Sequence, residues 1–324
     1  MIPRNLLAAV ATTIACIVTI PANAQSDFPN KTIRIFVGFP AGGSTDVLAR
    51  VLAQESRKSL GQDLIVINKG GAAGAIAITE LIASPADGYT VAITPSSVLT
   101  SAHHFQSIPP DFLEKTDGLL MAGRQRAGMM TRTESPLRNF QDFVTEARAN
   151  PGKLSIGFIG AGTTGAIIIK AVLLQEKLDV NLVPLNGDAP VTNAVLAGHV
   201  TAGIGSAAAF SEHIRAKSMR LLASAEADRI EVAPDVPNFV EMGYPYKGNA
   251  IQYLLAPKGL PPAVRQKLIE AFSEAMKSPS YIEIARKNEL YDPTVIKGAD
   301  LDKYLLQDRA EVSGLIEKLG LAKK

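Results

Sequence analysis

The stretch from Phe39 to Asp46, Phe-Pro-Ala-Gly-Gly-Ser-Thr-Asp, contains residue types that bind an anion without a catalytic group. Its two adjacent glycines let a ligand approach the backbone closely. Ser44, Thr45 and Asp46 favour the start of a helix. Backbone N–H groups in the first turn of a helix have no intrahelical acceptor and bind carboxylate or phosphate readily. The sequence therefore predicts one wall of an anion site here.

A second glycine-rich turn, Gly160-Ala-Gly162-Thr-Thr-Gly165, matches the dinucleotide pattern G-x-G-x-x-G. Asp188 follows the next predicted strand, where an acid that binds ribose would lie. A secreted NAD(P)-dependent oxidoreductase that uses Gly160, Gly162 and Gly165 is therefore an alternative. No His, Tyr or Lys is placed by the sequence to handle a hydride, so we favour a second anion site built from the same backbone chemistry.

Other catalytic or metal-binding patterns are missing from the sequence. His103-His104 has no third ligand at a recognisable spacing, and there is no H-E-x-x-H motif. There is also no G-x-S-x-G elbow, so the candidate serines, Ser96, Ser97 and Ser206 among them, are interpreted as hydrogen-bonding groups. We predict no catalytic residue, no metal and no cofactor.

Two sets of charged residues are explained without a role in ligand binding. Asp46 and Arg50 are four residues apart on a predicted helix, which favours an ion pair that supports the helix. Arg124 and Arg126 are interpreted as solvated, with a carboxylate partner in the cleft as the alternative.

The elements that position the turns alternate between strands and helices. Strands are predicted over 33–39, 64–67 and 89–93 in the first half, and over 154–159, 181–185 and 200–204 in the second. This alternation predicts mostly parallel sheets flanked by helices, with ligands bound beyond the carboxyl ends of the strands. Residues 101–123 are expected to be irregular.

The order of these elements predicts an α/β protein of two lobes, the second inserted into the first. The tail has helices but too few strands for a domain of its own. We expect a first lobe over 25–127, a second over 128–250, and a return to the first over 251–324. Crossings near 123–133 and 248–257 would form a hinge, and facing turns would form a cleft.

The N-terminus predicts export. Arg4 precedes an apolar run from Leu6 to Ile20, and Ala22-Asn-Ala24 follows, so residues 1–24 are predicted to be a signal peptide cleaved near Ala24. A membrane anchor is disfavoured because a span needs about 20 apolar residues. A lipoprotein is disfavoured because the residues before Cys16 fit its signal poorly.

Cys16 is the only cysteine and leaves with the signal peptide, so the mature chain has no thiolate site or disulfide. A net charge of +2 without a run of like charges disfavours nucleic acid. We expect a periplasmic protein without stable membrane insertion.

The ordered motifs resemble one family. Residues 39–50 resemble the first signature of the Bug-type solute receptors, the periplasmic binding proteins of tripartite tricarboxylate transporters, and residues 68–74 resemble their second glycine-rich turn. Five further motifs follow in the family's order: Ala83-x-Pro-x-Asp-Gly-Tyr-Thr90, Asn150-Pro-Gly152, Gly187-x-Ala-Pro190, Leu196-x-Gly198 and Asp235-Val-Pro237. The set covers essentially the whole mature chain.

The resemblance implies a periplasmic-binding-protein fold of the type with two crossings and no enzymatic activity. It implies binding of a small carboxylate, commonly a di- or tricarboxylate, an aromatic acid or an acidic amino acid, by a monomer that serves membrane permease subunits. A partner of a membrane sensor kinase is the alternative. By position, the ligand contacts would be Phe39, Pro40, Ala41, Gly42, Gly43, Ser44, Thr45, Gly74, Ala75, Ser96 and Ser97 in the first lobe, and Gly160, Ala161, Gly162, Thr163, Thr164, Asn186, Gly187 and Ser206 in the second.

Three positions depart from the family. The family often has Tyr-Lys-Gly where this chain has Leu185-Asn186-Gly187, and Asp is common where Asn193 and Thr201 stand. If those acids orient a ligand amine in relatives, their loss disfavours an amino acid and favours a plain or aromatic carboxylate. The second lobe is therefore expected to discriminate between ligands.

Overall fold

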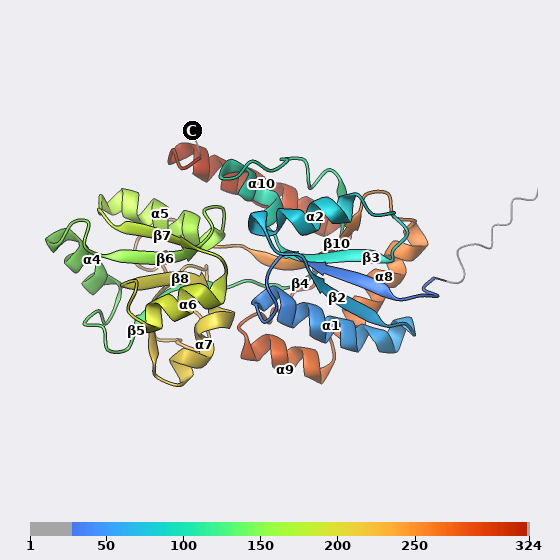
Figure 1. Cartoon of the computed structure of the whole chain (residues 1–324), viewed down its shortest axis with the longest axis horizontal. Helices are drawn as coiled ribbons and strands as arrows, with labels where there is room; N and C mark the ends of the chain where they lie inside the picture. Colours follow the sequence, from blue (N-terminus) through green and yellow to red (C-terminus); the bar gives the residue numbers. More distant parts are fainter. Residues whose placement is uncertain (1–27, 323–324) are drawn as a thin grey trace, which may run out of the picture.

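The computed structural model describes residues 28–322, and the predicted signal peptide lies outside them. Two sheets lie side by side along the long axis, each flanked by helices (Figure 1). We call the sheet of β1–β4 and β10 with its helices the first lobe, and the sheet of β5–β9 with its helices the second lobe. The predicted two-lobed α/β fold is confirmed.

The first-lobe sheet has the order β2-β1-β3-β10-β4. Its strands are β1 (Ile33–Val37), β2 (Leu64–Asn68), β3 (Thr90–Pro95), β4 (Thr116–Arg124) and β10 (Ile251–Pro257). Strand β1 pairs in parallel with β2 and β3, whereas β10 is antiparallel to both of its neighbours. The glycine-rich turns after β1 and β2 therefore lie at one edge of the sheet.

Strand β4 corrects the expectation that residues 101–123 are irregular. Its apolar run Leu119–Ala122 is short and lies between Gly118 and Gly123, which hides a strand pattern in the sequence. The strand forms because β10, more than 100 residues later, supplies its ladder partner. That partner is invisible to local periodicity.

The second-lobe sheet has the order β7-β6-β8-β5-β9. Its strands are β5 (Ala127–Arg132), β6 (Ser155–Ile159), β7 (Asn181–Leu185), β8 (Ala202–Ser206) and β9 (Met219–Ser224). Strand β6 is parallel to β7 and β8, and β5 is antiparallel to β8 and β9. Each lobe thus repeats one design, with a single antiparallel strand in each mostly parallel sheet.

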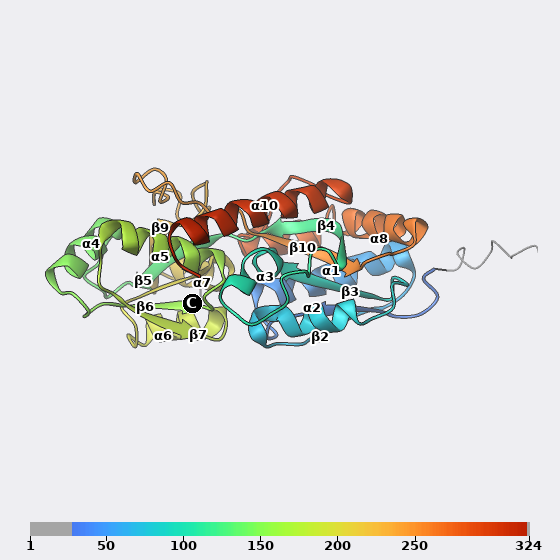
Figure 2. The ribbon, with the colours of Figure 1, turned by 90° about the horizontal axis from the view of Figure 1, so that it is seen from above.

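Helices cover both sheets, and Figure 2 shows α10 running from the first lobe toward the second. The first lobe has α1 (Ser44–Leu60), α2 (Ala75–Ile82), α3 (Ser97–Thr100), α8 (Pro262–Ala275), α9 (Pro279–Lys287) and α10 (Ala299–Lys318). The second has α4 (Phe140–Ala149), α5 (Thr164–Glu176), α6 (Asp188–Leu196) and α7 (Ala207–Arg215). Within residues 28–322, no helix has the length and apolar character needed to span a membrane.

The chain passes between the sheets twice, and the two passages are hydrogen-bonded to each other. The first lies between β4 and β5, where the Gln125 N–H donates to the Ala250 carbonyl of the second passage at 2.9 Å. Just before β10, the Gly248 N–H donates to the Ala225 carbonyl after β9 at 2.7 Å. These paired passages lie beside the space between the lobes.

Candidate ligand-binding cleft

A cavity of about 420 Å³ lies between the lobes and is lined by residues of both. The first lobe contributes the loop between β1 and α1, together with Val47, Pro95 and Ser97. The second lobe contributes the starts of α5, α6 and α7 and the end of β8. The volume lies within the range usual for small-molecule sites.

Asp46 holds the loop between β1 and α1 in place. Its buried carboxylate accepts hydrogen bonds from the Gly42 N–H, from Arg50 Nε and from Asn68 Nδ2, each at 2.9 Å. Burial opposes ionisation of Asp46, but the hydrogen bonds from Arg50, Gly42 and Asn68 outweigh it and hold the pKa below its ordinary value. The predicted Asp46–Arg50 ion pair is confirmed.

This arrangement uses one of the expected N–H donors. Because the Gly42 N–H points to Asp46, the donors free for a ligand are those of the first turn of α1. Gly43 is the N-cap residue without a side-chain cap, and Ser44, Thr45 and Asp46 follow it. Thr45 Oγ1 is occupied, since it donates to Gln252 Oε1 at 3.2 Å.

The end of the glycine-rich turn before α5, Thr163–Gly165, contributes to the opposing wall, and local structure explains each of the three glycines of the turn. Gly160 has a φ of +52°, which favours glycine. A Cβ on Gly162 would lie 2.8 Å from Ala102 Cα of the first lobe, and one on Gly165 would lie 3.3 Å from Ile204 Cγ1. Thr163 caps the helix by accepting from the Ala166 N–H at 3.4 Å. The pattern is explained without a pyrophosphate.

Helices α1, α5, α6 and α7 all begin at the cavity. The partial positive charge at a helix N-terminus attracts anions. One of these termini already has an acidic partner within the protein. Asp188, the first residue of α6, accepts through Oδ1 from the N–H of Ser206, the N-cap residue of α7, at 3.0 Å. The others face the cavity from opposite lobes.

Most of the residues expected to bind the ligand line the cavity: Phe39, Pro40, Ala41, Gly42, Gly43, Ser44, Thr45, Ser97, Thr163, Thr164, Asn186, Gly187 and Ser206. Gly74, Ala75, Ser96, Gly160, Ala161 and Gly162 do not. A Cβ on Gly74 would lie 3.2 Å from the Phe39 ring, so Gly74 packs behind the wall. The Ser96 N–H donates to the Ile251 carbonyl at 2.8 Å, which ties it to β10.

Two of the three departures from the family, Asn193 and Thr201, lie in different places. Asn193 lines the cavity and is exposed. Thr201 lies at the opposite end of β8, where its Oγ1 accepts from the Ser155 N–H at 3.1 Å, and it does not line the cavity.

Glu226 is the lining residue that sequence reasoning missed most clearly. It follows β9 and is 3% exposed, and its Oε1 accepts from the Ala127 N–H at 2.9 Å. Burial raises its pKa to about 7, against the smaller opposing effects of the Ala127 hydrogen bond, Arg124 and Arg126. No motif or spacing marks this residue, because it reaches the cavity only through the pairing of β5 with β9.

The cavity lining is poor in cations. It includes the acids Asp188 and Glu226 and one His, His213, but no Lys or Arg among the described residues. Burial raises the pKa of Asp188 to about 6. Neither Arg of the first passage lines the cavity: Arg124 Nε donates to Asp292 Oδ2 at 2.7 Å, and Arg126 Nη1 donates to the Glu289 carbonyl at 2.9 Å.

The lobes contact each other on both sides of the cavity. On one side, Ser101 Oγ donates to the Gly162 carbonyl at 2.7 Å, and the Lys170 ammonium lies 5.1 Å from the centre of the Phe105 ring. These contacts join the segment after α3 to the turn before α5 and to α5 itself.

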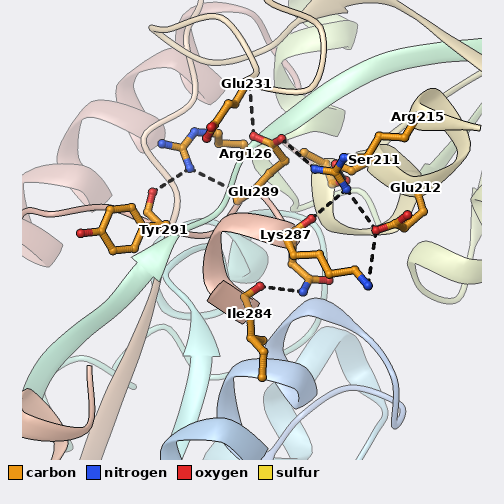
Figure 3. Close-up of polar contacts among 11 residues, drawn as sticks. Arg126, Ser211, Glu212, Arg215, Glu231, Ile284, Lys287, Glu289 and Tyr291 are labelled. Atoms are coloured by element: carbon orange, nitrogen blue, oxygen red, sulfur yellow. Dashed lines mark hydrogen bonds and ion pairs between the residues drawn. The ribbon is translucent and has the colours of Figure 1, made fainter. Parts of the chain in front are cut away.

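On the other side, α7 meets the segment that follows α9 (Figure 3). Arg215 Nη1 donates to the Lys287 carbonyl at 3.1 Å, and the Glu231 N–H donates to Glu289 Oε2 at 3.2 Å. Figure 3 shows Glu289 between Arg215 and Glu231, so the buried carboxyl of this first-lobe residue has two partners in the second lobe.

The histidine pair belongs to the first lobe and is not part of a metal cluster. The rings of His103 and His104 lie 4.1 Å apart, and His104 Nε2 lies 2.8 Å from Ser313 Oγ. Among residues 28–322, no group of three His, Cys, Asp or Glu residues is arranged to hold a metal ion.

Comparison with known proteins gives consistent matches. Residues 48–321 match the tripartite tricarboxylate transporter family receptor. The chain is 32% identical over 316 residues to the UPF0065 protein in gbd 5'region of Cupriavidus necator, covering 97% of this chain and 96% of that one. It is 32% identical to Protein BugT of Bordetella pertussis over 86% of both chains. A solved structure described as a periplasmic transporter is 28% identical, with a TM-score of 0.85 over 91% of this chain and 99% of that one.

Proposed function

The chain belongs to the tripartite tricarboxylate transporter receptor family, and on that premise we propose that it binds a small carboxylate between its lobes and delivers it to membrane permease subunits. It is a periplasmic solute receptor of the Bug type and not an enzyme. The dinucleotide alternative is therefore set aside. We further propose that the signal peptide is removed near Ala24 and that the mature receptor is a monomer.

The observation that supports carboxylate binding is the meeting of helix N-termini from opposite lobes at one cavity without a Lys or Arg in the described lining. A ligand carboxylate would accept from N–H groups at the starts of α1 and α5 and from the Ser97 hydroxyl. A hydrogen bond to a charged group contributes about 1.5–3 kcal/mol. Three or four such bonds account for the roughly 8 kcal/mol of a micromolar complex.

The expected contact residues divide into two proposed roles. Those that line the cavity would touch the ligand. The remaining six would support those residues from behind: Gly74, Ala75, Ser96, Gly160, Ala161 and Gly162.

The two lobes would move as two bodies about the paired passages, so that closure excludes water from the bound carboxylate. The first body would comprise residues 25–127 and 251–324, and the second would comprise residues 128–250.

Thermal unfolding of the mature protein with a panel of carboxylates tests this function. The panel contains malate, adipate, citrate, benzoate and glutamate, with NAD and NADP as controls. A ligand at about 100 times its Kd adds roughly 2.7 kcal/mol of stability. Stabilisation by NAD(P) and by no carboxylate would reject the proposal and favour the oxidoreductase.

Ser44→Pro tests whether main-chain N–H groups hold the carboxylate. Proline is well tolerated at the first position of a helix, and Gly43 has φ −76° and ψ 168°, which a following proline accepts. The change removes one N–H donor, so we expect affinity to fall about tenfold or more. Ser44→Ala, which keeps that N–H, is the matched control.

Capture of permease subunits by the ligand-bound receptor tests the delivery step. Capture of a sensor kinase in their place would support the alternative role in signalling.

A further inference from the structure

We propose that Glu226 contacts the ligand as a neutral acid whose Oε2–H donates to a ligand carboxylate. Where Glu226 is ionised in the free receptor, binding must then take up a proton from solvent. The inference rests on the proposed function and deepens it, because it assigns to one residue of the same cavity a dependence of affinity on pH.

The carboxyl of Glu226 is held between the two passages that join the lobes. On one side, its Oε1 accepts from the N–H of Ala127, the first residue of β5, at 2.9 Å. On the other side lies Gly248 of the second passage, where a Cβ would lie 2.6 Å from Oε1 and 2.9 Å from Oε2. A side chain at position 248 would displace the carboxyl, so glycine there leaves its place open.

One oxygen of this carboxyl lacks a partner. Glu226 is 3% exposed and lines the cavity, and its Oε2 is buried without a hydrogen-bond partner among residues 28–322. Buried polar atoms are nearly always hydrogen-bonded in folded proteins, so Oε2 points to a group that enters the cavity. Because Oε1 already accepts from Ala127, the protonated carboxyl would present its O–H at Oε2.

The charged groups around Glu226 do not supply a counter-ion for it. Arg124 is paired with a carboxylate of the segment after α9, and Arg126 donates to two main-chain carbonyls of that segment. The exposed Asp228 adds a negative charge. The pKa of Tyr304 in α10 is raised, chiefly by burial, so it stays neutral, and its hydroxyl donates to a carbonyl of the second passage at 2.8 Å.

The carboxyl therefore keeps its proton close to neutral pH. Burial raises the pKa of Glu226 to about 7, and Asp228 adds to the rise, whereas the Ala127 N–H, Arg124 and Arg126 oppose it. An anionic ligand beside Oε2 would disfavour the ionised form further, because like charges at short range repel. The neutral form would instead donate to the ligand carboxylate, in a hydrogen bond that the ligand's charge strengthens.

Asp188 does not act on the same ligand group. Ala127 and Ser206 are partners in the pairing of β5 with β8, but their N–H groups point away from each other. The Ala127 N–H bonds to Glu226, and the Ser206 N–H bonds to Asp188 at 3.0 Å on the opposite side of the pair. His213 is the third titratable residue of the described lining, so an experiment must separate three candidates for proton uptake.

Calorimetric titration from about pH 6.5 to 8.5, with the carboxylates of the thermal panel, measures the dependence on pH. In the parent protein, affinity should fall about fivefold or more over this range, because binding must restore the proton of Glu226. At about pH 7.5, titration in two buffers with different heats of ionisation should show uptake of about half a proton or more per ligand bound. The same ligand is used for every variant, so its own titration cancels in the comparison.

Glu226→Gln separates the proton from the side chain. The amide offers an N–H donor but does not ionise, so this variant should bind about as tightly as the parent does at the lowest pH. It should show neither the fall in affinity nor the proton uptake. Glu226→Leu lacks the donor and should bind about tenfold less tightly than Glu226→Gln at every pH. Asp228→Asn, the matched control at an exposed position outside the cavity lining, should keep both effects.

A fall in affinity and a proton uptake that persist in Glu226→Gln would overturn the proposal and assign the proton to Asp188 or His213. Equal affinities for Glu226→Gln and Glu226→Leu would overturn the hydrogen bond from Oε2. Parent affinity that is constant over the pH range would overturn the proposal too, and in all three cases the receptor function would stand. If no carboxylate of the panel binds at any pH, the proposed function fails, and the inference fails with it.

Discussion

At the scale of single residues, Asp46 shows how one side chain holds a loop that lines the cavity without lining the cavity itself. Its carboxylate joins the glycine-rich loop, the first helix and the end of β2 through Gly42, Arg50 and Asn68. The loop's shape is thus determined before a ligand arrives, which lowers the ordering cost of binding.

Asp46→Asn should lower the free energy of unfolding by about 2 kcal/mol and weaken ligand binding, because a buried charged hydrogen-bonding partner is lost. Asp46 has a depressed pKa, so its contribution is present above the unfolded pKa near 3.8 and is lost as the pH falls through the lower folded value. Urea unfolding between pH 2 and pH 7 measures both effects.

Asp63→Asn is the matched control, since Asp63 pairs with Arg57 on the surface, where the two side chains are 61% and 68% exposed. A change within about 0.5 kcal/mol is expected there. Equal losses in the two variants would contradict the role given to Asp46.

Glu226 should make stability depend on pH in the opposite direction. Its pKa is raised from 4.5 to about 7, chiefly by burial, with Asp228 adding to the rise and Arg124 and Arg126 opposing it. The folded state then binds a proton more tightly than the unfolded state, so the contribution of Glu226 to stability falls as the pH rises from about 4.5 to 7. Relative to the parent protein, Glu226→Gln should gain stability across that window, as measured by urea unfolding without ligand. A constant difference would show that Glu226 ionises normally.

At the scale of elements, the starts of helices provide the chemistry of the cleft. Helices α1 and α5 follow parallel strands in different sheets and point their N-termini at the same space. A strand, a tight turn and a helix therefore act as one unit, which the fold uses in both lobes.

Thr163→Ala and Asn139→Ala separate the stability of a helix from its role in binding. Each removes an N-cap, Thr163 from α5 and Asn139 from α4, and each should cost about 1 kcal/mol of stability. Only Thr163 lines the cavity, so only its replacement should weaken ligand binding in calorimetric titration. Equal affinities for the two variants would argue against a role for the start of α5.

At the scale of the whole molecule, the lobes approach closely enough to need glycine at their contact. Gly162 lies against Ala102, and the neighbouring Ser101 hydroxyl bonds to the Gly162 carbonyl. On the other side, Arg215 and Glu289 bring α7 to the segment after α9 (Figure 3). Under the proposed function, these contacts on both sides of the cavity would make ligand capture a property of the assembled pair of lobes.

Gly162→Ala should hinder closure, because the new Cβ would lie 2.8 Å from the backbone of Ala102. Overpacking of this kind costs about 1–3 kcal/mol, so affinity should fall about tenfold. Each lobe should keep its stability, since the hinge lets the lobes separate. Small-angle scattering should show a larger radius of gyration for the ligand-bound variant than for the ligand-bound parent.

Gly314→Ala is the control, because a Cβ at Gly314 in α10 would meet nothing within 4 Å. It should bind ligand normally and gain a little helix stability. An unchanged affinity and radius in Gly162→Ala would show that the lobes close without this contact.

The sequence by itself determined the family, the two-lobed α/β class and the two glycine-rich turns, because strand periodicity, helix starts and turn residues are local signals. The sequence did not reveal β4, because its partner strand β10 is remote. Nor did it distinguish Gly162 from the residues that line the cavity, because Gly162 is set apart only by its packing against the other lobe. Glu226 carried no signal of position either, and for Asp188 the sequence indicated only that it follows a strand. Only the tertiary structure decided that they flank one residue pair at the cleft, since sheet order joins segments that local patterns leave unrelated.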